Sequence, residues 1–139
     1  MSQRMTRDDF DFWISDMNVA LESFFNELPA NVRAALDESP ESLDALEAWI
    51  LERYPDSAHM IAADQASNVD GASRYIGEVF RKAHGGHWDI DLDHQESLFF
   101  SLPFLTGGST PIAPHSLATA TADRRTGTFL RTVLEATRP

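Results

Sequence analysis

Apolar side chains recur at three- and four-residue steps along the first third of the chain, which is the spacing of one helix face. Between Phe10 and Leu28 this pattern is continuous, and it predicts an amphipathic helix over residues 7–28. Pro29 ends that helix, because proline has no N–H to donate and cannot continue the pattern. A short helix is expected over residues 31–36.

Two further helices are predicted before the sequence changes character. Ser39 and Pro40 are typical of a helix start, a capping side chain followed by proline at the first helical position, and Pro55 ends this helix. A longer helix is expected over residues 57–84, with the Gly-Gly that follows as its C-terminal stop. Gly71 weakens it by roughly 1 kcal/mol relative to alanine, so two alternatives stay open, one continuous helix or a break near Asp70-Gly71.

The period of the pattern then falls to two residues. In HWDIDLD, residues 87–93, apolar residues alternate with aspartates, and this predicts a strand with one apolar and one acidic face. A second strand is expected over residues 96–105, after a DHQE hairpin connection, with Pro103 placing it at an edge or at its end. Helices are then expected over residues 115–122 and 125–138.

These elements predict a helix-rich α+β fold in a single domain, residues 1–139. Three or four N-terminal helices come first, then a small antiparallel sheet of two or three strands, then a C-terminal helix. A chain of 139 residues is long enough for one core. The side chains expected to be largely buried are Trp13, Phe24, Trp49, Tyr75, Ile76, Phe80, Trp88 and Phe99.

Composition limits the possible chemistry. The chain is 42% hydrophobic with nine Phe and three Trp, which is typical of a globular protein. It has no cysteine, which excludes disulfides, thiolate metal sites and a cysteine nucleophile. No apolar run is long enough for a transmembrane helix, and residues 1–11 lack a signal-peptide core. We therefore expect a cytoplasmic protein that does not bind membranes.

The net charge of −11 is unevenly distributed. Residues 1–123 hold seven Arg or Lys against 21 Asp or Glu, whereas residues 124–139 hold four Arg against one Glu. An acidic body repels phosphates, so nucleic acid is not an expected partner, and a basic protein is. The alternative is that the acidity serves solubility alone. The C-terminal arginines are expected to pair with the acidic body or to bind an acidic partner.

The densest candidate chemistry lies in HGGHWDIDLDH, residues 84–94. His84, His87 and Asp89 are residue types that bind zinc, iron or manganese, with His94 or His115 as a further ligand. The alternative is structural: the Gly-Gly ends a helix, and the aspartates form the solvated face of a strand. Both interpretations stay open at this point.

The three aspartates of this stretch have a second possible role. Asp89, Asp91 and Asp93 match the first ligand positions of an EF-hand loop, but His94 and Phe100 replace its required glycine and glutamate. A calcium loop is therefore excluded. As the acidic face of a strand, the three are the predicted contact with a basic partner.

Other candidate groups have ordinary explanations. Glu78 lies four residues from both Arg74 and Lys82, which favours surface pairing over acid–base catalysis. TGGST, residues 106–110, lacks the lysine of a P-loop, and the chain has no Gly-x-Ser-x-Gly motif. We assign no catalytic residue and no cofactor. An apolar-ligand pocket between the helices and the sheet is a third possibility, against a core that is simply rich in phenylalanine.

One segment resembles a known pattern. YIGEVFRKAHGGHW, residues 75–88, is a helix with Tyr-x-Gly-Glu that leads through Gly-Gly-x-Trp into a strand. It resembles small bacterial domains of unknown function, some of which occur among polymorphic-toxin immunity proteins. The resemblance implies an α+β fold in which Tyr75, Gly77 and Trp88 are packing residues, and it implies no catalytic residue.

The functional expectation is therefore a non-enzymatic, acidic protein-binding module of the immunity or adaptor type. The alternative is a metal-binding protein or metal-dependent enzyme that uses His84, His87 and Asp89.

Overall fold

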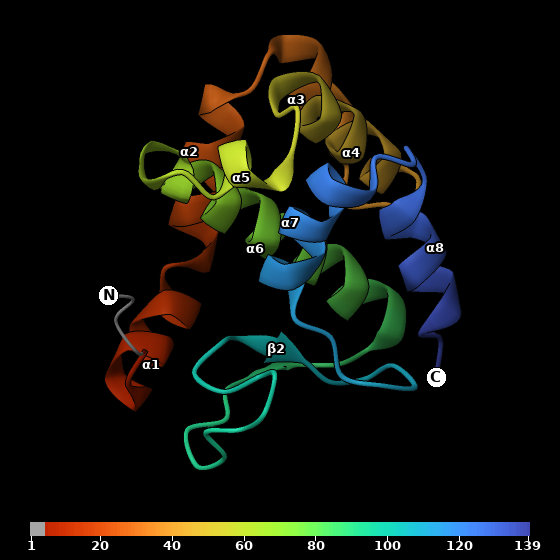
Figure 1. Cartoon of the computed structure of the whole chain (residues 1–139). Coiled ribbons are helices and arrows are strands. Elements are labelled where there is room, and N and C mark those ends of the chain that lie inside the picture. Colours follow the sequence, from red (N-terminus) through yellow and green to blue (C-terminus); the bar gives the residue numbers. More distant parts are fainter. Residues whose placement is uncertain (1–4) are drawn as a thin grey trace.

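The computed structural model describes residues 5–139 and shows a helix-rich α+β fold, as predicted (Figure 1). Helices come first, a small two-stranded antiparallel sheet follows, and helices close the chain. The elements are α1 (Arg7–Ser15), α2 (Met17–Glu27), α3 (Ala30–Ala35), α4 (Ser42–Arg53), α5 (Ser57–Met60), the 3-10 helix η1 (Ala63–Gln65), α6 (Ala66–His84), β1 (Trp88–Asp89), β2 (Phe104–Leu105), α7 (Pro114–Arg124) and α8 (Phe129–Ala136).

The first predicted helix is two helices, α1 and α2, with a break at Asp16. The Thr6 side chain accepts a bond from the N–H of Asp9 and completes a capping box at the start of α1. Near the break, the carbonyl of Trp13 accepts a bond of 2.8 Å from Nη1 of Arg74 on α6. This tertiary bond competes with the helical bond at that carbonyl, so the prediction of one continuous helix was wrong there.

Helix α6 is the central element, with α2, α4 and α7 packed around it (Figure 1). Almost every residue from 69 to 80 is buried. Its glycines are sites of close approach, as predicted for Gly77: a Cβ there would lie 2.0 Å from the Trp88 ring. A Cβ on Gly71 would lie 2.3 Å from the Phe24 ring. Helix α6 runs without interruption through Gly71, so of the two alternatives the continuous helix is the one observed at that position.

The interruption of the predicted fourth helix lies earlier, between α5 and α6. Asp56 caps α5, because its carboxylate accepts a bond of 2.9 Å from the N–H of His59. Met60 is fully buried, whereas Ile61 beside it is 63% exposed. The chain turns at this point and re-enters the helical path through η1, as Figure 1 shows above α6.

The sheet is much shorter than the alternating pattern predicts. Residues 90–103 form turns rather than strands, with one isolated bridge between Asp91 and Phe100. The Asp91 carboxylate accepts bonds from the N–H groups of Asp93 and His94, and this turn replaces the inter-strand bonds of the predicted hairpin. The long second strand was therefore wrong, although β1 and β2 pair antiparallel as expected.

The core lies between α6 and the helices around it. Five of the eight side chains predicted to be buried are so, and the other three are half-buried. The buried ones are Phe24, Trp49, Tyr75, Ile76 and Phe80, and the half-buried ones are Trp13, Trp88 and Phe99. Trp13 and Trp88 meet edge to face at the margin of the core, with ring centroids 4.9 Å apart.

Candidate functional site

The predicted metal ligands each bond to a different partner. His84 Nε2 lies 3.1 Å from the Thr137 hydroxyl, and His87 Nδ1 lies 3.2 Å from the Thr106 hydroxyl. The Asp89 carboxylate accepts a bond of 2.8 Å from the N–H of the next residue. Within residues 5–139, no group of three or more His, Asp or Glu side chains is placed to hold a metal ion.

The three predicted partner-binding aspartates also differ in their surroundings. Asp89 is half-buried, whereas Asp93 is exposed. The Asp91 carboxylate accepts the bonds that hold the turn described above. The pKa of Asp91 is lowered mainly by the bond from the backbone N–H of Asp93, and further by the bonds from His94. The Asp91 carboxylate thus stabilises the turn. Among the three aspartates, Asp93 is the most accessible to a partner.

Carboxylates from separate elements line a groove between α2 and the start of α6. Asp16 and Glu27 line it from the α2 side, and Asp64 and Asp70 line it from η1 and α6. Arg53 is the single cationic side chain among the lining residues. We call this hollow of about 640 Å³ the acidic groove.

Two charges of the acidic groove are already bound within the protein. Asp70 accepts bonds from Trp13 Nε1 at 2.8 Å and from Arg74 Nε at 2.7 Å. Arg53 donates to Gln65. By contrast, Asp16, Glu27 and Asp64 form no ion pair with any residue from 5 to 139. Because Gln65 is neutral, Arg53 keeps its positive charge and offsets one of these three carboxylates, and the groove as described has a net negative charge.

The outer surface of α1 and α2 extends this negative character. Residues 7–27 carry six carboxylates against Arg7 alone. Phe12 and Val19 lie on the same two helices and are 69% and 67% exposed. Large exposed apolar side chains within a charged surface are typical of a protein-binding patch when they cluster.

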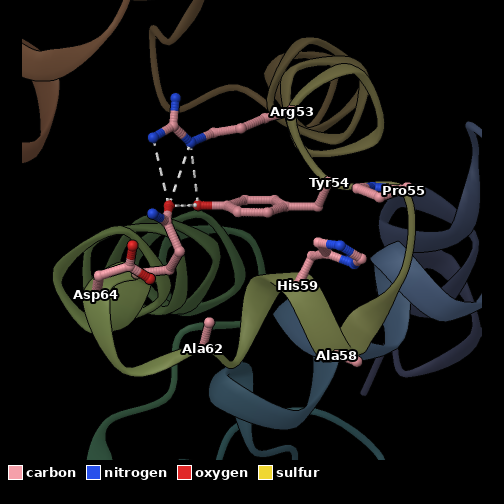
Figure 2. Close-up of a pocket in the computed structure, with 8 residues that line it drawn as sticks. Arg53, Tyr54, Pro55, Ala58, His59, Ala62 and Asp64 are labelled. Carbon is pink, nitrogen blue, oxygen red and sulfur yellow. Dashed lines mark hydrogen bonds between the residues drawn. The ribbon is translucent and has the colours of Figure 1, made fainter.

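A second hollow, of about 560 Å³, adjoins the acidic groove (Figure 2). Figure 2 shows Arg53 and Tyr54 at the end of α4, facing His59 and Asp64 of the α5–η1 segment. The Tyr54 hydroxyl donates to Gln65 Oε1 at 2.6 Å, and Arg53 bonds the same oxygen. Of these bonded side chains, Arg53 and Gln65 line both hollows, whereas Tyr54 lines the second hollow.

All four C-terminal arginines contact the protein itself, but among the described ion pairs Arg131 alone pairs with the acidic body, as one of the two expectations has it. Arg131 forms an ion pair of 3.2 Å with Asp44 of α4, and Arg138 pairs with Glu135. Arg125 donates to the carbonyls of Leu51, Tyr54 and Ala122, which lie at the ends of α4 and α7. Arg124 lies over the Phe129 ring at 5.4 Å.

Glu78 also has a structural partner, although not the predicted one. Its two oxygens accept bonds from Arg81, and one of them accepts a bond of 3.0 Å from Trp88 Nε1. Arg74 and Lys82 pair instead with Asp70 and Glu38. Three-residue rather than four-residue spacing places Glu78 beside Arg81, and Oε2 of Glu78 accepts bonds from both Arg81 and the indole.

No protein-family model matches this chain, and neither the curated proteins nor the solved structures that were searched contain a match. The resemblance of residues 75–88 to immunity-type domains therefore stays a prediction. Across residues 5–139, no helix combines the length and the apolar character needed to cross a membrane.

Proposed function

We propose that the protein is a non-enzymatic, acidic binding module of the immunity or adaptor type, which holds a basic segment of a partner protein in the acidic groove. One observation carries the proposal: Asp16, Glu27 and Asp64 line one open groove, and none of them forms an ion pair within residues 5–139. A lysine or arginine side chain entering the groove supplies the missing countercharges.

The dimensions of the groove suit a segment of chain rather than a single ion. A volume of about 640 Å³ is within the range of sites that hold a peptide side chain and its flanking backbone. Val19 lines the same groove and adds an apolar contact beside the charges. The acidic body accelerates the approach of a basic partner, and added salt weakens that attraction.

The experiment compares three forms of the full chain in quantitative capture from a lysate of the source organism. The groove variant is Glu27→Gln with Asp64→Asn. The control, Glu41→Gln with Asp123→Asn, removes the same charge from exposed positions outside the groove. We expect a basic protein that the wild type and the control retain and that the groove variant binds at least about tenfold more weakly, since each partly desolvated pair contributes on the order of 1 kcal/mol.

Two further measurements complete the test: the salt dependence of binding, and binding by a third variant. Retention of the captured protein is expected to fall steeply as salt is raised, and Asp93→Asn tests the contribution of the predicted 89–93 surface. A captured protein that binds the groove variant and the control equally, or that is insensitive to salt, overturns the proposal for the groove. Capture of no basic protein overturns the binding-module function itself.

A further inference from the structure

A smaller and more enclosed pocket lies where α1, α6 and the start of α7 meet the 101–103 loop. Its volume is about 170 Å³. The walls are mainly apolar and include the indoles of Trp13 and Trp88 and the rings of Pro103 and Pro114. We call it the indole pocket. Of the acidic-groove residues, it shares Asp70 alone with that site.

The two indoles are fixed in place through their N–H groups. Trp13 Nε1 donates to Asp70 at 2.8 Å, and Trp88 Nε1 donates to Glu78 at 3.0 Å. The Arg74 guanidinium lies 4.2 Å from the centre of the Trp13 ring, and the two indoles pack at an interplanar angle of 78°. Since both indole donors are occupied, Trp13 and Trp88 offer a ligand apolar ring surface only.

Most polar groups of the pocket are also occupied. Ser73 donates to a carbonyl of its own helix, and both Asp70 oxygens accept bonds from α1 and α6. The Ser101 hydroxyl exchanges bonds with the backbone of Met5. The imidazole of His115 is different, because it has no hydrogen bond to any residue from 5 to 139.

His115 lies at the rim of the pocket, where the residue as a whole remains exposed. Desolvation nevertheless lowers the pKa of its imidazole, and the negative charge of Asp70 partly opposes that effect. This lowered pKa favours the neutral form of the ring, in which one nitrogen donates and the other accepts a hydrogen bond.

We propose that the indole pocket binds a single-ring aromatic molecule with one hydroxyl group, which lies against the indoles and hydrogen-bonds to His115. The size fits, because an apolar cavity of about 150 Å³ is large enough for benzene. Edge and offset contacts with Trp13 and Trp88 favour an aromatic ring over an aliphatic chain. A neutral hydroxyl suits the neutral imidazole, whereas the protein's net charge of −11 disfavours an anion.

The probes that test this are p-cresol and toluene, which differ by the hydroxyl alone. Each is titrated into the full chain, and binding is followed through the indole N–H resonances of the three tryptophans. We expect both probes to shift the signals of Trp13 and Trp88 but not that of Trp49, which packs elsewhere in the core. The wild type is expected to bind p-cresol about fivefold more tightly than toluene, which is the net value of one neutral hydrogen bond.

Variants of His115 distinguish binding of the aromatic ring of the probe from the hydrogen bond to its hydroxyl group. His115→Phe is expected to remove the preference for p-cresol while toluene still binds, and His115→Gln is expected to retain it. His59→Phe, at an exposed histidine outside this pocket, is the matched control and leaves both affinities unchanged. The proposal is overturned if neither probe shifts Trp13 or Trp88, if Trp49 shifts equally, or if His115→Phe keeps the preference.

Discussion

The folded structure depends strongly on one buried carboxylate, that of Glu47 on α4. It is fully buried, and it accepts bonds of 3.0 and 2.9 Å from the N–H groups of Phe129 and Leu130 at the start of α8. These are orphan donors of a helix N-terminus, where a negative charge is stabilised by the helix dipole. Glu47 therefore caps a helix that lies about 80 residues later in the chain, as the sequence separations of 82 and 83 show.

The loss of stability on removing this carboxylate can be worked out from the N–H groups that would lose their acceptor. Glu47→Ala leaves two buried N–H groups without an acceptor, at roughly 1–3 kcal/mol each, and it leaves a cavity in the core. We expect the free energy of unfolding to fall by about 3–5 kcal/mol, a large part of the total of roughly 5–15 kcal/mol for a domain. Glu47→Gln keeps one acceptor oxygen and should cost about half as much.

The assay is urea unfolding followed by tryptophan fluorescence, with the midpoint and the m-value fitted separately. Glu52→Ala is the matched control, since Glu52 lies on the same helix, is exposed and forms no hydrogen bond within residues 5–139. The control should shift stability by less than about 0.5 kcal/mol. If Glu47→Ala is no more destabilising than Glu52→Ala at an unchanged m-value, the capping argument is refuted.

Two further predictions concern α6. Gly77→Ala places a Cβ 2.0 Å from the Trp88 ring, so we expect a loss of about 1–3 kcal/mol by urea unfolding and a displaced Trp88 indole resonance; an unchanged indole signal would contradict the close approach. Burial raises the pKa of Tyr75 to about 12. Its contribution to stability is therefore complete below about pH 10 and is lost as the pH rises through 12. In Tyr54→Phe, where Tyr75 is the sole tyrosine, absorbance should show ionisation only near that upper value, and ionisation near 10 in the folded protein would refute it.

Helices could be predicted from the sequence because their signals are local. Apolar spacing and end residues such as Pro29 act within a few positions, and the Gly85 stop is confirmed by its left-handed φ of 77°. The break at Asp16 carries no such signal, since neither glycine nor proline lies there. It coincides with a bond from Arg74 to the Trp13 carbonyl, 61 positions apart, which local patterns cannot report.

The strands could not be predicted to their full length for a related reason. Alternation in residues 87–93 is compatible with a strand, but a strand also needs a partner that supplies backbone bonds. Asp91 offers its carboxylate to nearby N–H groups, which gives the backbone a local alternative. The alternation in residues 87–93 is therefore compatible with a strand but does not determine its length. The bonds from the Asp91 carboxylate to nearby N–H groups compete with pairing between strands and limit how far the strand extends.

The acidic groove shows the same limit for function. The charge of residues 1–123 predicted an acidic surface and a basic partner, and the contact was assigned to the aspartates at 89–93 because they alternate with apolar residues as on one face of a strand. In the structure Asp16 and Glu27 line the same groove as Asp64 because α2 packs on α6. That approach is possible because Gly71 has no side chain where the ring of Phe24 lies. The contact between Phe24 and Gly71 in the core thus determines where the carboxylates of the proposed partner site lie. Composition therefore predicted that this site is negatively charged, but it could not predict where the site is.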